Sequence, residues 1–298
     1  YGGISMDIWH KAGRIFKLSN LGTLIFFLLN IGLILAFFCP DGITIESALP
    51  LIVCYTITVL LSLSPVGECF FSIFIGAKEI KRTDIKIRMI PLLEIVFDTA
   101  KREFPSMVNS IRLKIILDNA PNAFAIGRKT ICITLGLLNL SDEEIMAVLA
   151  HEMGHIAYRH SVIQLLIGGA NIFISGFLVL IRCICWIITG ILTLLGLATR
   201  SVLGTVLMAL FGSISAVLIW LWTKFCMIFL MWSMRQNEYV ADEFAYKIGY
   251  GEMLAKVLDN QLCQMPKCSL FKALYSTHPS SYDRIARLQS LGVRYSRF

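Results

Sequence analysis

His151-Glu152-Met153-Gly154-His155, in the middle of the 298-residue chain, has the spacing of the HExxH motif. On an α-helix its two histidines stand one turn apart on the same face, so both imidazoles can bind one zinc ion. The glutamate between them can then take a proton from a water molecule beside the metal. A five-residue pattern also arises by chance, and the simpler interpretation is two histidines packed in a core. The surrounding sequence decides between these interpretations.

The motif lies in a segment that is predicted to form one uninterrupted helix. Ser141, followed three residues later by Glu144, forms a capping box, which is typical of a helix N-terminus. The motif residues then recur at helical spacing, and no helix breaker precedes His160. We therefore expect the helix to run through His160, whose side chain is predicted to face solvent or the membrane interface.

The composition is that of a membrane protein. Hydrophobic residues make up 56% of the chain and charged residues 16%, whereas a soluble domain has about half and about a quarter. The net charge of +7 does not indicate nucleic-acid binding, because the basic residues flank apolar segments instead of forming one patch with aromatic residues. The lipid bilayer is therefore an expected partner, and nucleic acid is not.

Hydropathy divides the chain into five segments. A basic N-terminal segment and two mixed segments alternate with two long apolar segments, which we interpret as two membrane hairpins with four transmembrane helices. The predicted segments are residues 1–20 (N-terminal), 21–77 (first hairpin), 78–162 (first half of a soluble unit), 163–233 (second hairpin) and 234–298 (second half of that unit).

Each hairpin carries features that predict where its helices bend. The first contains apolar runs at residues 21–39 and 49–77, and the second run holds Pro65 and Glu68. We therefore expect the first part of that run to span the membrane and the rest to continue as an interfacial helix. The second hairpin is predicted to contain two long helices that turn near Arg200, with four short spans as the alternative.

The distribution of Lys and Arg predicts the orientation. Basic residues flank the first hairpin on both sides, whereas its connecting loop contains Asp41 and Glu46 but no basic residue. The positive-inside rule then places the N-terminus and both mixed segments in the cytoplasm.

The mixed segments are predicted to form a mostly helical unit with a small sheet. Residues 91–103 show helical spacing of apolar residues. Residues 112–118 and 129–135 are rich in Ile, Leu and Thr and are separated by turn residues at 119–122, which predicts a short antiparallel sheet. The predicted fold class is a mainly α membrane protein with a zincin-type cytoplasmic unit that contains a small antiparallel sheet.

A catalytic zinc needs a third protein ligand from another element, and the sequence offers three candidates. His160 does not fit the metzincin spacing, and His278 precedes a proline in a loop. Glu238 and Asp242 stand one helical turn apart, so one carboxylate could bind the metal while the other accepts the second ring N–H of a ligand histidine. Such a pair also suits the solvated N-terminus of a helix. Together with the HExxH helix, metal binding is the favoured interpretation.

In combination, these features resemble the HtpX-like membrane metalloproteases, relatives of the CAAX prenyl proteases within the gluzincin group. The resemblance covers nearly the whole chain and includes the order of its segments. The matching stretches are Pro121-Asn122-Ala123-Phe124-Ala125 with Gly127, Ser141 to His155, Glu238 to Asp242, and Thr277-His278-Pro279 with Arg284.

The resemblance implies a metal site and a base. His151, His155 and Glu238 would bind one zinc ion per chain, Asp242 would support a ligand histidine, and Glu152 would be the general base.

The resemblance also implies how substrate is held. His278 and Arg284 would stabilise the transition state or orient the site, whereas the simpler interpretations are a loop histidine and a surface salt bridge. Substrate would add as an extended strand to an active-site edge formed by Asn122, Ala123, Phe124 and Ala125.

The activity implied by the resemblance is that of a zinc endopeptidase in the bacterial inner membrane. Its active site would face the cytoplasm and would cleave misfolded or damaged membrane proteins under stress. A CAAX-type processing protease is the first alternative, but it would need about seven spans, as the resemblance implies. A non-catalytic polytopic scaffold or transporter is the second, and its charges would line a membrane pathway. Here the acidic residues and histidines cluster in the mixed segments instead.

Overall fold

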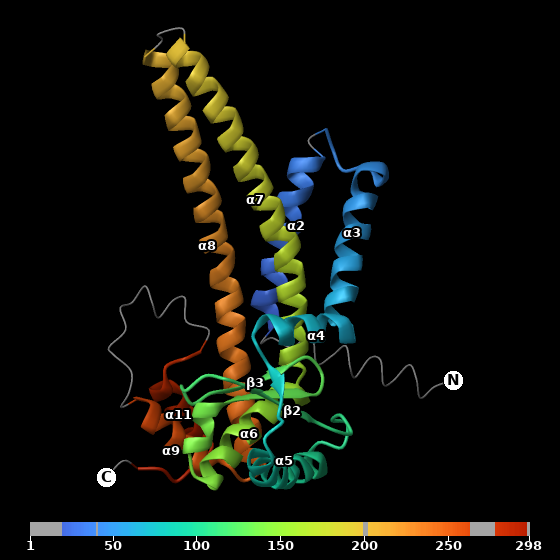
Figure 1. Cartoon of the computed structure of the whole chain (residues 1–298), viewed down its shortest axis with the longest axis vertical. Coiled ribbons are helices and arrows are strands. Elements are labelled where there is room, and N and C mark those ends of the chain that lie inside the picture. The colour runs from blue at the N-terminus through green and yellow to red at the C-terminus, as the bar shows by residue number, and fades with distance from the viewer. Residues whose placement is uncertain (1–19, 40, 199–201, 263–277, 297–298) are drawn as a thin grey trace.

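The computed structural model of the chain describes residues 20–39, 41–198, 202–262 and 278–296. Long helices rise from one end of a smaller unit that holds the sheet and the shorter helices (Figure 1). Apart from Asn20, the predicted N-terminal segment lies outside the described residues. The same holds for Arg200, where the sequence predicts the turn of the second hairpin.

Apolar helices form the elongated part of the molecule. α2 packs along α8, α3 along α7, and α7 along α8. Within the described residues, the stretches 160–198 and 202–247 each form one long helix, which differs from the alternative of four short spans. The bounds are Leu21–Phe38 for α2, Ile45–Leu63 for α3, His160–Ala198 for α7 and Val202–Lys247 for α8.

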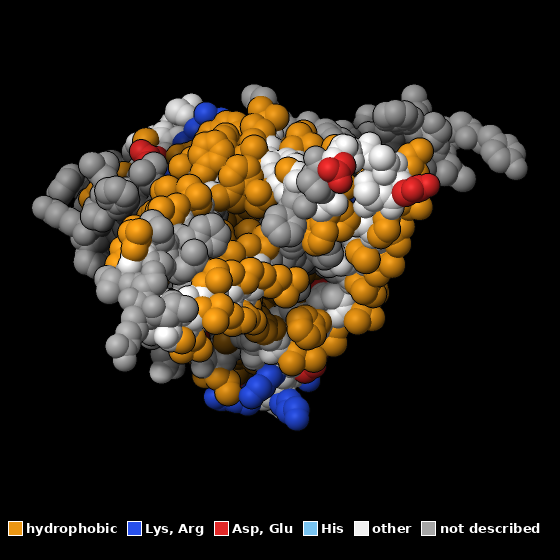
Figure 2. All heavy atoms as spheres, turned by 90° about the horizontal axis from the view of Figure 1, so that it is seen from above, with side chains coloured by type: hydrophobic (Ala, Val, Ile, Leu, Met, Phe, Trp, Pro, Cys, Tyr) orange, Lys and Arg blue, Asp and Glu red, His pale blue; other side chains and the backbone are white. Residues whose placement is uncertain are grey.

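The outward side chains of these helices identify an integral membrane protein. Within the described part of the chain, three helical stretches are long and apolar enough to cross a bilayer, namely Ile45–Leu63, Leu178–Gly196 and Gly212–Lys247. α2 is apolar but shorter. Seen from above, hydrophobic side chains dominate the described surface (Figure 2). Such helices satisfy their own backbone hydrogen bonds, as the bilayer interior requires.

The second apolar run breaks into two helices, as its proline predicts. α3 ends at Leu63, and α4 (Pro65–Phe74) begins with Pro65 at its first position. Ser64 links the two, and its Oγ accepts hydrogen bonds from the backbone N–H groups of Val66 and Gly67. α4 therefore lies across the direction of α3 (Figure 1).

The sheet is mixed, so the prediction of an antiparallel sheet is wrong. The strand order is β1-β2-β4-β3, and the β2–β4 pair is parallel, whereas β1–β2 and β3–β4 are antiparallel. The bounds are Lys78–Glu79 for β1, Arg112–Ile116 for β2, Ala123–Ile126 for β3 and Thr130–Thr134 for β4.

The short hairpin between β3 and β4 explains this topology. It places β3 on one side of β4, so β2 can reach only the other side of β4. β3 reverses the chain after β2, and β4 reverses it again, so β2 and β4 run in the same direction. The sequence indicates strands by composition, but composition does not encode which neighbours pair.

A single apolar core holds the smaller unit together. It lies between the sheet, α5 (Thr83–Glu103), α6 (Asp142–Ala157) and the C-terminal end of α8. A short 3₁₀ helix, η2 (Leu135–Asn139), leads from β4 to α6, and α9 (Gly251–Leu262) and α11 (Ser281–Ser290) close the other side. The buried residues of this core include Met89, Val96, Ile131, Leu149, Phe244 and Leu288.

The motif helix ends earlier than the sequence predicts. α6 stops at Ala157, and α7 begins at His160. Between them Arg159 adopts a φ of 63°, a left-handed conformation that cannot continue a right-handed helix and is unusual for Arg. The chain changes direction here, so α6 stays in the core while α7 leaves toward the membrane.

Candidate metal centre

α6 presents the HExxH side chains from a well-formed helix. The predicted capping box is confirmed: Ser141 Oγ accepts the Glu144 N–H, and Glu144 Oε2 accepts the Ser141 N–H at 3.0 Å. His151 and His155 are both buried, and their Nε2 atoms lie 3.2 Å apart. The two rings thus point into one common space.

α8 brings the third candidate ligand to this space. Glu238 Oε2 lies 3.5 Å from His151 Nε2, and Glu238 Oε1 lies 3.3 Å from His155 Nε2. Of the three candidates in the sequence, Glu238 is therefore the one that faces both imidazole Nε2 atoms.

A glycine makes this approach of α6 and α8 possible. A Cβ atom on Gly154 would lie 2.9 Å from the Cα of Ala241, which is too close for real atoms. Ala241 is fully buried and lies between Glu238 and Asp242 in the sequence. The small residues at both positions therefore let the two helices meet closely enough for their side chains to share one site.

Asp242 and Arg284 fix the orientation of His151. Asp242 Oδ1 lies 2.9 Å from His151 Nδ1, which leaves Nε2 of that ring facing the site. Arg284 on α11 binds the same carboxylate with two nitrogens, Nε at 2.8 Å and Nη2 at 2.6 Å. Its Nη1 also lies 3.2 Å from Glu238 Oε2. Arg284 is buried, so the surface salt bridge considered for it is ruled out.

The donor set suits a divalent metal ion. One donor atom from each of His151, His155 and Glu238 lies within 4.8 Å of the others, and zinc commonly takes such donors. Within the described residues, Glu238 Oε2 is buried and accepts no hydrogen bond of good geometry, although nitrogens of His278 and Arg284 lie at ion-pair distance. A buried carboxylate oxygen of this kind is stabilised by a cation.

The charge balance of the site also favours a bound cation. Burial and Arg284 alone would lower the pKa of His151, but the carboxylates of Asp242 and Glu238 outweigh them and raise it to about 10. The carboxylates thus stabilise positive charge at this ring, whether a proton or a metal ion supplies it.

Glu152 is buried beside the edge of the sheet. Burial raises the pKa of Glu152 above its ordinary value, and His155, His151 and a hydrogen bond from the Ala125 backbone partly offset this effect. Ala125 lies in β3, so the carboxylate of the predicted base contacts the strand that is predicted to bind substrate.

β3 is the outer strand of the sheet on this side. Within the described part of the chain it pairs only with β4, which leaves its other edge unpaired. Ala123 and Ala125 are buried and Phe124 is half-buried. Asn122 is exposed, but its backbone is bound to Thr134: its N–H donates to Thr134 Oγ1 and its carbonyl accepts the Thr134 N–H. Asn122 therefore anchors the start of the strand.

His278 reaches the site from the C-terminal part of the chain. Its Nδ1 lies 2.9 Å from Glu238 Oε2, and its side chain is 65% exposed. The nearby Glu238 carboxylate raises the pKa of His278 above its ordinary value. The position of this side chain, at the open side of the centre, is compatible with contact to a substrate. Thr277, which belongs to the same matching stretch, lies outside the described residues.

His160 is a residue whose importance the sequence prediction missed. Its side chain is only 2% exposed, and its Nδ1 lies 3.1 Å from His155 Nδ1. The expectation that it faces solvent or the membrane interface is wrong, because the break at Arg159 turns it back toward α6. His160 thus contacts the second ring nitrogen of His155 as Asp242 contacts that of His151.

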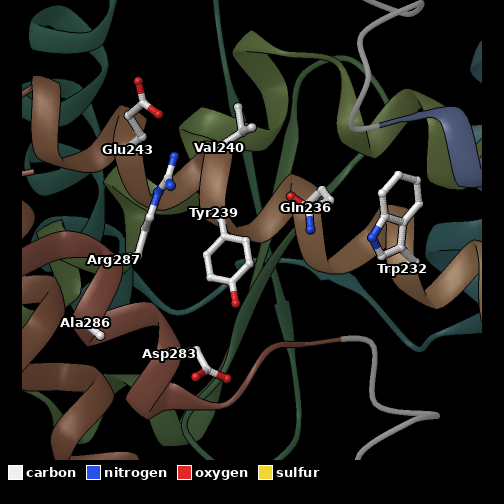
Figure 3. A pocket seen from close by; sticks show the side chains of 8 residues that line it. All are labelled: Trp232, Gln236, Tyr239, Val240, Glu243, Asp283, Ala286 and Arg287. Carbon is white, nitrogen blue, oxygen red and sulfur yellow. The ribbon is translucent and has the colours of Figure 1, made fainter. Parts of the chain in front are cut away.

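A cavity of about 560 Å³ lies between α8 and α11 (Figure 3). Its lining includes Trp232, Tyr239 and Arg287 but none of the three candidate ligands. This cavity is therefore not the space that the candidate ligands face.

Comparisons with known proteins agree with this geometry. Residues 92–291 match the model of peptidase family M48. A protease HtpX homolog of Tropheryma whipplei (strain Twist) is 29% identical over 247 residues, covering 74% of this chain and 77% of that protein. A protease HtpX homolog of Neisseria meningitidis serogroup B is 32% identical over 187 residues, covering 57% of this chain and 63% of the relative.

A solved structure shows the same fold. The crystal structure of S. mikatae Ste24p matches with a TM-score of 0.52 and 16% sequence identity. The match covers 95% of this chain and 65% of that chain.

Proposed function

The chain belongs to peptidase family M48, and from this premise we propose that it is a membrane-embedded endopeptidase that uses one zinc ion per chain. As a member of this family it is a metalloprotease, and its apolar helices make it an integral membrane protein. The choice of zinc, the role of each residue and the kind of substrate are the parts that we propose.

One observation carries the proposal. Two imidazoles from α6 and one carboxylate from α8 converge within 4.8 Å, and the buried carboxylate of Glu152 lies among them beside the unpaired edge of β3. A metal can activate water, a base can accept its proton and a strand edge can hold an extended peptide, so the three together suit metal-dependent peptide hydrolysis.

The residues around the site each have a role in the mechanism. A bound zinc ion would polarise the scissile carbonyl and lower the pKa of water. The Glu152 carboxylate takes the proton of the attacking water and passes it to the leaving nitrogen.

His278 and Arg284 divide the roles that the resemblance implies for them. The exposed His278 can donate a hydrogen bond to the developing oxyanion. The buried Arg284 orients Asp242 and Glu238 and is therefore assigned to positioning. Substrate binds as an additional strand along residues 122–125, with β3 supplying backbone hydrogen bonds.

The location follows from charge and topology. We assign four spans, with α2 as the shortest, and place the protease unit in the cytoplasm because basic residues flank the first hairpin. The relatives are bacterial proteins, and we place the chain in the bacterial inner membrane. Misfolded or damaged membrane proteins are the proposed substrates.

A CAAX-type processing protease is the second candidate. The likeness to Ste24p fits this alternative. It is less favoured because a processing protease of that kind would need a chamber built from more spans than the helices described here provide.

Glu152→Gln tests the proposal. The variant should retain one zinc per chain, while cleavage of casein in detergent should fall about 10²–10⁴-fold, because only the proton transfer is removed. Glu143→Gln, on an exposed position of the same helix, is the matched control. Chelator-sensitive cleavage that survives in Glu152→Gln would exclude Glu152 as the base. Wild-type protein without metal would instead favour the non-catalytic scaffold.

A further inference from the structure

The short helix α4 has two faces of opposite character. Val66, Phe70, Ile73 and Phe74 share one face at helical spacing and are between 64% and 79% exposed. On the opposite face Ser72 is buried, and Phe71 and Ile75 pack against Ile126, Cys132 and Leu165. One side of α4 therefore belongs to the sheet, and the other presents large apolar side chains outward.

The place of α4 in the fold identifies what covers its apolar face. α3, which is long and apolar enough to span, ends at Leu63, and α4 starts two residues later and lies across it (Figure 1). The apolar face is thus continuous with the surface of a membrane span. Exposed basic residues follow nearby, at Lys78 and Lys81 after the helix and at Arg128 in the β3–β4 turn. An apolar face bordered by basic side chains suits the interface of a bilayer that contains anionic lipids.

The inner face of α4 contacts the turn of the β3–β4 hairpin. Thr130 Oγ1, at the start of β4, donates a hydrogen bond to Glu68 Oε1 at 2.5 Å. The same carboxylate lies against Gly127, where a Cβ atom would come within 2.4 Å of Glu68 Oε2. Gly127 also has a φ of +58°, a conformation that glycine adopts at little cost.

A second membrane helix holds the same turn. Ser161, in the first turn of α7, is buried and donates a hydrogen bond to the Gly127 carbonyl at 2.6 Å. The turn at the end of β3 is therefore fixed between α4 and α7, which both lead to membrane spans.

We propose that α4 lies in the headgroup region of the bilayer and, through Glu68 and Gly127, holds the β3 edge at the membrane surface, so that the enzyme preferentially cleaves extended segments close to a membrane anchor. This inference rests on the proposed function and specifies its substrate class. A segment that leaves the bilayer as an unfolded chain meets the β3 edge directly, whereas a soluble peptide gains nothing from α4.

Photocrosslinking locates the apolar face. A benzoylphenylalanine in place of Phe70, in nanodiscs that contain phosphatidylglycerol, should crosslink to phospholipid. The same probe in place of Ile87, which is 71% exposed on α5, should not. Crosslinks from position 70 to a second copy of the chain or to another protein, with none to lipid, would overturn the proposal.

Two substrates test the consequence for cleavage. The double variant Phe70→Ser, Ile73→Ser should lower kcat/KM about tenfold for a substrate whose cleavage site lies within ten residues of a transmembrane helix, because less apolar surface is buried in the interface. Cleavage of a soluble peptide with the same site, and zinc content, should stay within about twofold of wild type. An Ile87→Ser, Ile95→Ser variant, altered at two exposed positions on α5, is the control.

The outcomes separate the two proposals. If the wild type cleaves both substrates and the α4 variant slows both equally or neither, the inference about α4 is wrong while the protease function stands. If the wild type cleaves neither substrate in the presence of zinc, the proposed function itself fails, and the inference falls with it.

Discussion

The two halves of the candidate metal centre differ in how the chain specifies them. The half on α6 is local: its histidines and base lie within five consecutive residues on one capped helix. The half on α8 and α11 consists of Glu238, Asp242 and Arg284, which follow the α7–α8 hairpin or its second helix and reach α6 because that hairpin folds back. The difference teaches that the α6 half supplies a recognisable motif, whereas the tertiary fold supplies the complete ligand set.

Removing the distant ligand should have the largest effect. Glu238→Ala should abolish stoichiometric zinc binding and lower the rate of casein cleavage at least about a thousandfold, because the metal contributes several kcal/mol to transition-state stabilisation. Metal analysis and a cleavage assay of the purified variant measure both effects.

Glu243→Ala is the matched control on the same helix, since its carboxylate pairs with exposed Lys247 one helical turn away and, among the described residues, with no candidate ligand. This variant should retain zinc and activity. Full zinc occupancy in Glu238→Ala would show that the α6 half binds the metal without α8.

A smaller effect is expected from His160, which contacts the ligand histidine His155 but lies outside the HExxH motif. His160→Ala should weaken zinc binding about 10–100-fold, because a group that holds the second ring nitrogen of a ligand histidine orients that ring. Competition with a fluorescent chelator measures the affinity.

His160→Asn serves as the companion variant. Its side-chain oxygen can accept the same hydrogen bond, so part of the lost affinity should return. Equal affinities for wild type and His160→Ala would mean that His160 only fills space in the core.

The smallest effect should come from the local cap of α6. Ser141→Ala removes the hydroxyl that accepts the Glu144 N–H and should lower the free energy of unfolding by about 1 kcal/mol, with zinc content unchanged. Thermal unfolding in detergent measures this change, and Ser110→Ala at an exposed loop position is the control. A loss of zinc in Ser141→Ala would mean that the position of the ligand histidines depends on the N-terminal cap of α6 as well as on the contacts between helices.

The same contrast explains how much the sequence predicts. The capped helix and its HExxH motif follow from spacing within one element, and the structure confirms the helix and its capping box. The helices of the hairpins follow from their unbroken apolar runs. Glu238 can be named as a candidate because its one-turn spacing from Asp242 is also local.

Features that depend on contacts between elements are beyond the reach of such patterns. The parallel pairing of β2 with β4 depends on which side of β4 the hairpin leaves open. The burial of His160 depends on the left-handed backbone conformation of Arg159, which the presence of an arginine at that position does not predict. Gly154 fills a variable position of the motif, and its need to be small becomes visible only when Ala241 lies against it.

The central claim is that both halves bind the same metal ion. Zinc-edge X-ray absorption of the purified wild-type chain tests it most directly. We expect two imidazole nitrogens and one carboxylate oxygen at about 2.0–2.2 Å, with the carboxylate contribution absent from whatever zinc remains in Glu238→Ala. A spectrum with three imidazoles, which would bring His160 or His278 into the ligand set, or identical spectra for the two proteins, would contradict the account.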